Sequence, residues 1–229
     1  MDPHDIEALA ARMPLAEGYR FEMLRRAELG ALIAAIEAWF PDISVGGASC
    51  YLRPAFYAEK VFLADGPERD GLVMLLKHGD ELAGMFSVER DPDTLAVYAR
   101  LGVAAPHHRG ARLAQTGLTF TEAYGRRLGL GLAYGMATLK APHAQRAFER
   151  AGWQLIGITP GYDREMVGPG SVKRVFEAVY AKVLVGDAGL LWPQHQNMTP
   201  RTRAMFDRLF AAHPAHVDSN RELADAAAG

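Results

Sequence analysis

The order of strand and helix patterns along the chain constrains its fold more than any other feature. Two apolar runs, residues 71–77 and 81–90, are separated by a polar turn at 78–80, and a third run follows over residues 94–104. Short turns between such runs predict antiparallel strands. From residue 111 onward, helical and extended patterns alternate instead. This order predicts an α/β (α+β) protein with a mixed, mostly antiparallel central sheet flanked by helices.

The second half of the chain supplies the alternating elements. Residues 111–127 place apolar side chains on one helical face, and residues 131–139 have the composition of a buried strand. Residues 142–152 predict a short helix, because Pro142 favours a helix start and Gly152 a helix end. The remaining predictions are a strand over residues 153–159, a long loop over 160–171 and a final strand over 172–185.

We predict one domain over residues 1–185 and a C-terminal extension over residues 186–229. The domain begins with a helix over residues 4–13, a strand over 18–26, a helix over 27–40 and an ambiguous segment in which Pro54 could open a short helix. The extension contains one helix, residues 200–212, with Thr199 as its N-cap. Its apolar stripe is expected to pack on the sheet, with a homodimer interface as the alternative.

Composition narrows the class of partner. A net charge of -2 gives no global attraction to nucleic acid or to an anionic membrane. No apolar run approaches the length of a membrane span, and the acidic first segment does not fit a signal peptide. The single cysteine, Cys50, excludes an internal disulfide. We therefore expect a cytoplasmic protein with neither nucleic acid nor membrane as partner.

Residues 109–114, here called the anion loop, carry positive charge where a strand ends and a helix begins. Helix starts favour acidic residues because their first amides are unpaired, yet Arg109 and Arg112 stand here. Such amides beside Gly110 favour a phosphate group, and together with Arg109 they could hold a pyrophosphate; two solvated surface charges are the alternative. No Gly-Lys-Ser/Thr follows, which excludes a Walker A site. The glycines of residues 129–135 precede a strand, which argues against a dinucleotide fingerprint.

The order strand, P-x-x-R-G-x-x-x-A, helix, strand, and a short helix ending in A-F-E-R-A-G-W resembles the GNAT superfamily of acyl-CoA-dependent N-acyltransferases over about residues 70–185. The family's pyrophosphate signature, Gln/Arg-x-x-Gly-x-Gly/Ala, would fall on Arg109, Gly110, Ala111, Arg112, Leu113 and Ala114. The first and last positions match, and Arg112 replaces the central glycine. The resemblance also implies that the backbone of Gly102, Val103 and Ala104 pairs with the pantetheine arm of the coenzyme.

The same resemblance implies direct transfer of an acetyl group from acetyl-CoA to a small-molecule or peptide amine, without a covalent enzyme intermediate. The family often has Asn at the position of Ala141 and Tyr at that of Phe148, which also borders the coenzyme. That Tyr protonates the departing thiolate, and a phenyl ring has no proton to donate. Two alternatives therefore stay open: a non-catalytic acyl-CoA sensor or scaffold, and an acyltransferase with a longer acyl donor.

Candidate catalytic groups are few. Glu89 ends a central strand and is a candidate general base, with a solvated strand-end charge as the alternative. Tyr162 lies in the predicted long loop and is a candidate replacement acid. Asp163 and Glu165 in that loop could attract a cationic acceptor. A backbone N–H near Val103 or Ala104 would meet the oxyanion, if the family geometry holds.

No metal site is expected. His107 and His108 are adjacent in sequence, so we expect their side chains to diverge, and no HExxH or paired Cys/His spacing is present. Either they line the mouth of the anion loop or they face solvent.

Overall fold

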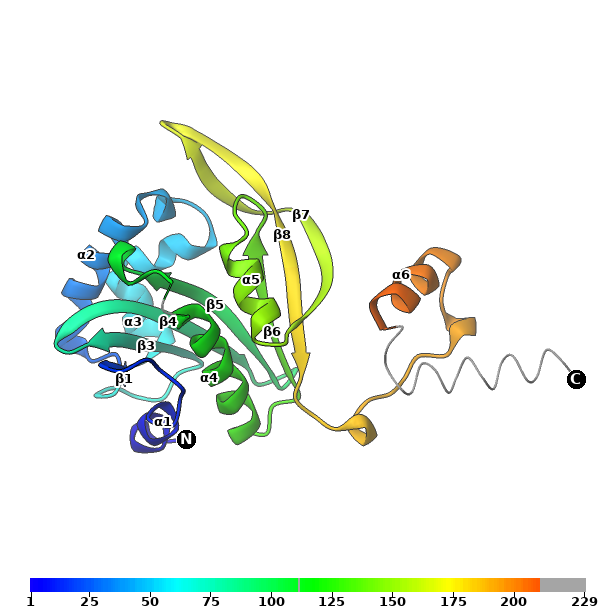
Figure 1. The fold of residues 1–229 in the computed structure, drawn as a ribbon, viewed down its shortest axis with the longest axis horizontal. Coiled ribbons are helices and arrows are strands. Elements are labelled where there is room, and N and C mark those ends of the chain that lie inside the picture. Colours follow the sequence, from blue (N-terminus) through cyan, green and yellow to red (C-terminus); the bar gives the residue numbers. More distant parts are fainter. Residues whose placement is uncertain (111, 211–229) are drawn as a thin grey trace, which may run out of the picture. The chain divides into compact units, whose positions relative to one another are not determined.

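The structure is a computed structural model that describes residues 1–110 and 112–210. The chain divides into two compact units, Met1–Leu184 and Val185–Gly229. Figure 1 shows the course of the chain from the N-terminal helix through the sheet. The last position of the second unit that the structure describes is residue 210.

The first unit is built on an eight-stranded sheet in which seven strands follow the order β1-β3-β4-β5-β6-β8-β7 and β2 pairs with β3. The strands are β1 (Tyr19–Met23), β2 (Val61–Phe62), β3 (Gly71–His78), β4 (Glu81–Asp91), β5 (Ala96–Ala104), β6 (Leu132–Thr138), β7 (Gln154–Gly168) and β8 (Ser171–Val183). The antiparallel β3–β4–β5 series confirms the predicted hairpins. The central β5–β6 pair is parallel, and β6–β8–β7 is antiparallel again. The predicted mixed, mostly antiparallel sheet is confirmed.

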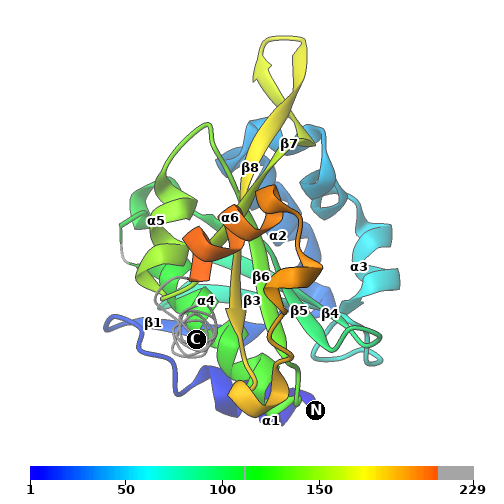
Figure 2. The ribbon, with the colours of Figure 1, turned by 90° about the vertical axis from the view of Figure 1, so that its right-hand side faces the viewer.

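Helices cover both faces of this sheet. They are α1 (Pro3–Ala10), α2 (Leu29–Trp39), α3 (Pro54–Lys60), α4 (Leu113–Arg127) and α5 (His143–Arg150), with short 3₁₀ helices η1 (Arg26–Glu28), η2 (Pro41–Ser44), η3 (Gly47–Leu52) and η4 (Pro106–His108). Figure 2 shows α4 and α5 on one side of the sheet and α2 and α3 on the other. Pro54 opens α3, which resolves the ambiguous segment of the sequence.

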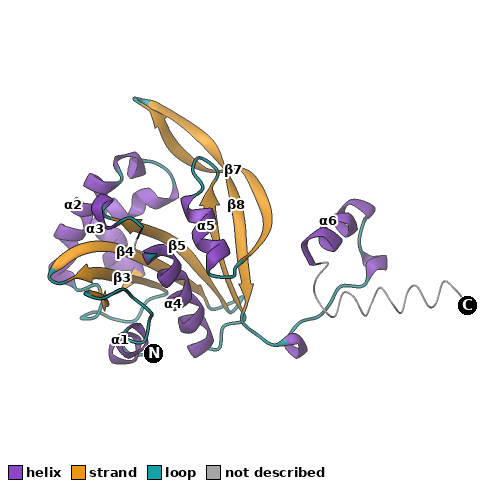
Figure 3. Ribbon diagram, in the orientation of Figure 1, coloured by secondary structure: helices purple, strands orange, loops and turns teal. Residues whose placement is uncertain are grey.

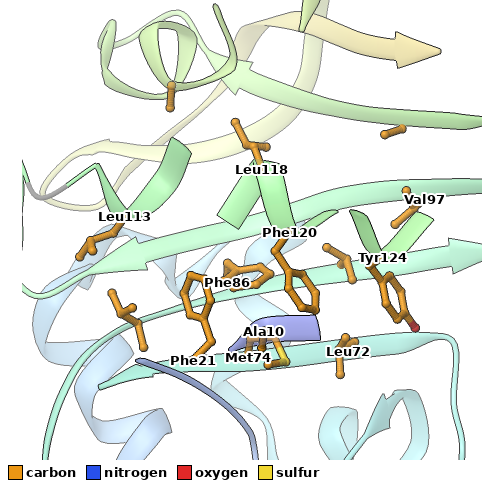
Figure 4. Packing of buried hydrophobic residues seen from close by; sticks show 14 of the residues in the cluster. Ala10, Phe21, Leu72, Met74, Phe86, Val97, Leu113, Leu118, Phe120 and Tyr124 are labelled. Atoms are coloured by element: carbon orange, nitrogen blue, oxygen red, sulfur yellow. The ribbon is translucent and has the colours of Figure 1, made fainter. Parts of the chain in front are cut away.

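The core on the α4 side is built around aromatic side chains. The rings of Phe21 and Phe86 meet edge to face with centroids 4.9 Å apart, and Phe86 meets Phe120 of α4 at 5.2 Å (Figure 4). A Cβ atom at Gly117 would lie 3.2 Å from Cγ of Phe86, so a larger residue there would require the Phe86 ring or the helix to shift by a few tenths of an ångström. The predicted apolar face of this helix therefore contacts β4 closely.

The core on the opposite face joins α2 and α3 to the middle strands. Leu32 and Ile36 of α2 and Tyr57 of α3 are fully buried together with Val73 and Val103. Val103 thus packs its side chain on this face, one residue from the end of β5. The two cores fix β5 from both sides.

The β5 and β6 strands separate halfway along their length. They pair only from Ala96 with Leu132 to Ala99 with Gly135, whereas β4 continues to pair with β5 as far as Ala104. The register between β4 and β5 also shifts between Ser87 and Val88, so Arg100 is an extra, bulged residue of β5. Beyond Ala99, the edge of β5 that faces β6 is therefore unpaired.

The prediction of a long loop over residues 160–171 is wrong. The segment belongs to β7 and β8, which form a hairpin with its turn at residues 169–170 (Figures 1 and 3). Three register shifts interrupt β7, and one leaves Pro160, Gly161 and Tyr162 between the pairs of Thr159 and Asp163. These bulges break the strict alternation by which a strand is recognised, and the Gly and Pro residues resemble loop composition.

The second unit contains the last described helix, α6 (Pro200–Phe210), after short 3₁₀ helices η5 (Asp187–Gly189) and η6 (His195–Asn197). The amide of Thr202 donates to Oγ1 of Thr199 at 3.3 Å, which confirms the predicted N-cap. Residues 211 and 212 of the predicted helix lie outside the described residues. The rings of Phe206 and Phe210 pack against Trp192 of the same unit, with centroids 6.1 and 6.3 Å away.

Among the helices of residues 1–110 and 112–210, none combines the length and the apolar character that a bilayer crossing requires.

Candidate active site

Two residues of the anion loop, Gly110 and Arg112, have positive φ angles. Gly110 has φ of +99°, which favours glycine, and a Cβ there would meet no atom within 4 Å. Arg112 adopts the left-handed conformation, with φ 57° and ψ 21°, and forms the N-cap of α4. Ala111, also predicted to bind the coenzyme, lies outside the described residues. The loop therefore turns twice through conformations suited to glycine before α4 begins.

The start of α4 offers free donors. Its first turn has no acidic residue, and no side chain within the described part of the chain caps it. The amides of Leu113 and Ala114 belong to the first turn of the helix, where intrahelical acceptors are missing. The helix dipole adds a positive potential at the same place. These amides can bind an anion.

The side chain of Arg109 lies beside this loop. Its guanidinium donates to the carbonyl oxygen of Trp39 at 3.4 Å and lies over the ring of Phe40, 5.9 Å from the centroid. Both contacts are at the C-terminal end of α2, whose dipole favours a cation. A distance of 3.4 Å is long for an N–H···O bond, so a phosphate oxygen would be a stronger partner.

The unpaired edge of β5 begins after Ala99 and continues to the end of the strand at Ala104. The amide of Ala105 donates to Ala83 of β4 at 2.9 Å, and a Cβ at Gly84 would lie 2.6 Å from the carbonyl oxygen of Val103. Polar groups of a strand alternate in direction, so Val103 faces β4, whereas Gly102 and Ala104 face the open edge. Gly102 is exposed, with open space where its side chain would be. Of the three residues predicted to pair with pantetheine, Gly102 and Ala104 have backbone groups available.

Phe148 lies at the point where β5 and β6 separate. A Cβ at Gly135 would be 2.6 Å from Cζ of Phe148 and 3.2 Å from the carbonyl oxygen of Ala99. The phenyl ring is buried and stacks on Tyr180, with centroids 4.9 Å apart. The Tyr180 hydroxyl donates to Oε1 of Glu149 at 3.0 Å. Phe148 has no hydroxyl, and the hydroxyl of Tyr180 is bonded to Glu149, so neither ring supplies a proton donor where β5 and β6 separate.

A second group of side chains lies on the opposite face of the sheet. Tyr98 of β5 is paired with Tyr134 of β6, and their rings stack with centroids 5.0 Å apart. Tyr162 lies in the bulge of β7, near enough to Tyr98 to affect its pKa. Burial, and then Tyr162 and the carboxylate of Glu177, raise the pKa of Tyr98 above its usual range. We call Tyr98, Tyr134, Tyr162 and Glu177 the tyrosine–glutamate cluster.

Glu177 supplies the carboxylate of this cluster. It pairs with Thr138 of β6 and is only 9% exposed. Burial, followed by the nearby carboxylates of Asp163 and Glu165, raises the pKa of Glu177 to about 7. Within the described residues, no hydrogen bond or ion pair compensates its charge. Such a group can accept a proton near neutral pH.

Asp163 and Glu165, predicted to attract a cationic acceptor, both have partners. Asp163 accepts a hydrogen bond from the amide of Gly47 at 2.9 Å and thereby ties β7 to η3. Glu165 forms an ion pair with Lys140, whose Nζ lies 2.7 Å from Oε2. Their charges still act on Glu177 through space.

Glu89, the predicted base, has a partner as well. Its carboxylate forms an ion pair with the guanidinium of Arg100. Arg100 is the bulged residue of β5 and lies over the ring of Phe56, 5.6 Å from the centroid. Glu89 is opposite Tyr98 in the β4–β5 register, so the ion pair borders the tyrosine–glutamate cluster.

Comparisons with known proteins agree with this arrangement. No family model and no curated protein matches the sequence. The ribosomal L7/L12 alpha-N-protein acetyltransferase RimL superposes with a TM-score of 0.56 at 13% identity, covering 76% of this chain and 99% of its own. Spermidine N-acetyltransferase from Vibrio cholerae, in complex with CoA and spermine, gives 0.56 at 13% identity over 74% and 97%. An IAA acetyltransferase from Bacillus cereus gives 0.51 at 12% identity over 72% and 99%.

The chain has the GNAT fold. The resemblance deduced from the sequence is thereby confirmed at the level of fold. The GNAT signature has glycine at the position of Arg112, and the left-handed backbone there explains that preference. The arginine keeps the glycine-like conformation, at a cost of about 1–2 kcal/mol for a residue with a side chain.

Within the GNAT fold, sequence patterns did not reveal Glu177. It stands between Phe176 and Ala178 in a strand, where its spacing resembles any outward-facing polar residue. It pairs with Thr138 of β6 and Thr159 of β7, and these residues come beside it only in the folded sheet. A local signal was therefore absent.

The expectation that the side chains of His107 and His108 diverge is wrong. Their ring centroids are 4.3 Å apart, and both Nε2 atoms face the carboxylate of Glu81 at the start of β4. In the 3₁₀ turn of η4, successive side chains are about 120° apart and not on opposite sides as in an extended segment, so both rings can reach Glu81.

Proposed function

We propose that the protein is an N-acetyltransferase that moves an acetyl group from acetyl-CoA to an amine by direct attack. The observation that carries this proposal is the separation of β5 from β6 beside the anion loop. It leaves Gly102 and Ala104 with free backbone groups in line with the exposed amides of α4. The pantetheine arm of acetyl-CoA would bind the unpaired edge of β5, and its diphosphate would bind the neighbouring amides of α4.

The residues present fit the coenzyme. Gly110 leaves open space at the loop, and the amides of Leu113 and Ala114 are placed for a diphosphate. Arg109 would add a charged hydrogen bond, with a strength of about 1.5–3 kcal/mol. The solved spermidine N-acetyltransferase with CoA bound supports the same donor for this fold.

We assign the general base to Glu177. A protonated amine with a pKa of about 10.4 must lose a proton before it can attack. The carboxylate of Glu177, with its pKa raised to about 7, is ionised in half or more of the molecules at and above neutral pH. It would take the proton from the ammonium, directly or through a water molecule, and leave a neutral amine. Glu89, the base predicted from sequence, would instead fix the position of the Arg100 guanidinium through their ion pair.

The remaining steps use the backbone and a phenol. The amine lone pair forms the new C–N bond, and the negative charge on the carbonyl oxygen would be stabilised by an N–H of Gly102 or Ala104. Collapse of this intermediate breaks the C–S bond. Tyr162 would give its proton to the thiolate, because Phe148 cannot. The nitrogen, positively charged after the attack, would lose its second proton to the Tyr162 phenolate through the Tyr98 hydroxyl, which gives the neutral amide and restores the phenol.

The acceptor is proposed to be cationic, as a small molecule or a peptide amine. Glu177, Asp163 and Glu165 place negative charge around the tyrosine–glutamate cluster. Proteins of the same fold include a spermidine acetyltransferase and a ribosomal protein acetyltransferase, so both kinds of amine suit this architecture.

A thiol-release assay tests the proposal. Acetyl-CoA is mixed with the protein and a panel of polyamines, amino acid amides and peptides, and free thiol is measured with and without each amine. Amine-dependent release is expected for at least one acceptor. Measurable CoA binding without release for any acceptor would favour a non-catalytic sensor or scaffold, which the phenyl ring of Phe148 makes a specific alternative. Release only from longer acyl-CoA donors would identify a different acyltransferase.

A further inference from the structure

Three metal-ligating side chains converge at the turn before the anion loop. One ligand atom each from Glu81, His107 and His108 lies within 4.8 Å of the other two. Nε2 of His107 is 2.6 Å from Oε1 of Glu81, and Nε2 of His108 is 3.4 Å from Oε2. The backbone bond from Ala105 to Ala83 holds the turn against β4, so the groups come from two joined elements.

His108 is the group that points to a ligand. Its side chain is only 7% exposed, and its buried Nε2 makes no hydrogen bond to any residue that the structure describes. Its other ring nitrogen, Nδ1, is 2.8 Å from the hydroxyl of Tyr19. If Nδ1 donates to that hydroxyl, Nε2 carries a lone pair that faces the Glu81 carboxylate. In that tautomer two electron-rich atoms face each other, and a cation bound between them would stabilise the pair in place of the hydrogen bond that now joins Glu81 to His107.

Such an arrangement is characteristic of metal-binding histidines. A ligating imidazole usually gives its second N–H to an oxygen, which fixes the tautomer and the ring orientation. Here Tyr19 would fill that role for His108. The Tyr19 ring packs edge to face against His108, with centroids 5.6 Å apart, and in a tilted arrangement against His78 at 4.6 Å, so the hydroxyl is held in place.

We propose that Glu81, His107 and His108 bind a divalent transition-metal ion such as Zn²⁺, with Tyr19 positioning His108. Two imidazoles and one carboxylate form a donor set that zinc uses, whereas magnesium and calcium prefer oxygen ligands alone. The Glu81 and His107 side chains are 53% and 62% exposed, so the ion would reach them from solvent and keep a position for water. The site is distinct from the tyrosine–glutamate cluster and does not rest on the proposed acyl transfer.

The ion would join the β3–β4 hairpin to the turn that leads into Arg109 and Gly110. Glu81 is the first residue of β4, next to the hairpin turn, and His108 immediately precedes Arg109. A bound ion would therefore act as a cross-link at the base of the anion loop.

Zinc titration of the full chain tests the site. The protein is stripped with a chelator, and Zn²⁺ binding is followed by calorimetry, with Mg²⁺ as the comparison ion. We expect one Zn²⁺ whose affinity falls more than about tenfold in Glu81→Gln and in His107→Ala, because each loses a direct ligand. The matched control is His143→Ala, an exposed histidine of α5, which should leave this affinity unchanged. Both altered ligands are exposed, and circular dichroism checks that the variants stay folded.

Tyr19→Phe separates a positioned site from a chance pair of histidines. Loss of the hydroxyl leaves all three ligands but frees the ring of His108, so affinity should fall about 10–100-fold. Co²⁺ substituted for Zn²⁺ should show an absorption spectrum that changes in Tyr19→Phe and not in His143→Ala. Zn²⁺ affinity equal in Glu81→Gln, His107→Ala and His143→Ala would overturn the proposal, as would failure of the wild type to bind Zn²⁺ at all.

Discussion

The two sides of the separated strands are built in different ways. On the side proposed to bind the coenzyme, here called the donor side, the anion loop is one continuous segment, and its polar groups are backbone amides of Gly110 and the first turn of α4. On the side proposed to bind the amine, here called the acceptor side, the tyrosine–glutamate cluster takes one side chain from each of β5, β6, β7 and β8. The donor side is exposed and positive, whereas the acceptor side is partly buried and negative.

This difference has a chemical reason. A diphosphate is the same in every acyl-CoA, so amides fixed by helix geometry can bind it with little dependence on side chains. An acceptor amine needs a proton acceptor of matched pKa, and only a side chain in a particular environment provides one. Substitutions should therefore affect turnover on one side and coenzyme affinity on the other.

The largest effect is expected at Glu177. Glu177→Gln keeps the size of the side chain but removes the proton acceptor, so kcat should fall about 10²–10⁴-fold. Wild-type kcat should rise as pH increases through about 7, because only the ionised carboxylate is a base. The variant should lose that rise, which steady-state kinetics across neutral pH would detect, while calorimetry should give unchanged CoA affinity.

Glutamine substitutions at two other glutamates serve as controls for this experiment. Glu165→Gln, on the same hairpin as Glu177, removes a carboxylate that already pairs with Lys140, so at saturating amine kcat should fall far less than in Glu177→Gln. The pH at which kcat rises should shift down, because one charge that raises the pKa of Glu177 is lost. Glu89→Gln removes the partner of Arg100. A greater loss of kcat in Glu89→Gln than in Glu177→Gln would return the role of base to the residue predicted from sequence.

Tyr162→Phe tests the acid on the same side. Loss of the hydroxyl should lower kcat about a hundredfold, at the lower limit for positioned proton transfer, because water can also protonate a thiolate. CoA affinity should not change. Tyr134→Phe is the matched control, since Tyr134 stacks on Tyr98 through its ring and this stack is kept. An unaltered rate in Tyr162→Phe would exclude it as the acid.

Arg109→Ala tests the contribution of the donor side to CoA affinity. It removes one charged hydrogen bond, so the Kd for CoA should increase about tenfold or more, whereas kcat at saturating acetyl-CoA should stay the same. Arg127→Ala, an exposed arginine at the other end of α4, serves as control. Calorimetry that gives equal affinities for the two variants would remove Arg109 from the coenzyme site.

The same contrast explains what the sequence could predict. The donor side lies in one segment, so its signature at Arg109, Gly110 and Ala114 was visible, and the helix signals at Pro142 and Gly152 were local too. The β3–β4–β5 hairpins followed from short turns between apolar runs. Each of these features depends on residues within a few positions of one another.

Features that depend on distant contacts were missed. The β7–β8 hairpin has bulges whose register is set by β8, so residues 160–171 resembled a loop. The raised pKa of Glu177 comes first from burial in the folded protein and then from the carboxylates of Asp163 and Glu165 on the neighbouring strand. The convergence of His108 on Glu81 requires the β3–β4 hairpin. Periodicity along one segment contains no information on such pairs.

The smallest effect is expected at Arg112, where the donor side departs from its family signature. Arg112→Gly and Arg112→Ala both remove the cation, but only glycine adopts the φ of 57° without strain. The glycine variant should therefore be more stable than the alanine variant by about 1 kcal/mol, or roughly 2–4 °C in Tm for a chain of this size. Any cationic contribution of Arg112 to CoA binding should be lost equally in both, which calorimetry measures. Equal melting temperatures would mean that the loop relaxes around the side chain, and that glycine in the signature serves close approach of the diphosphate instead of backbone conformation.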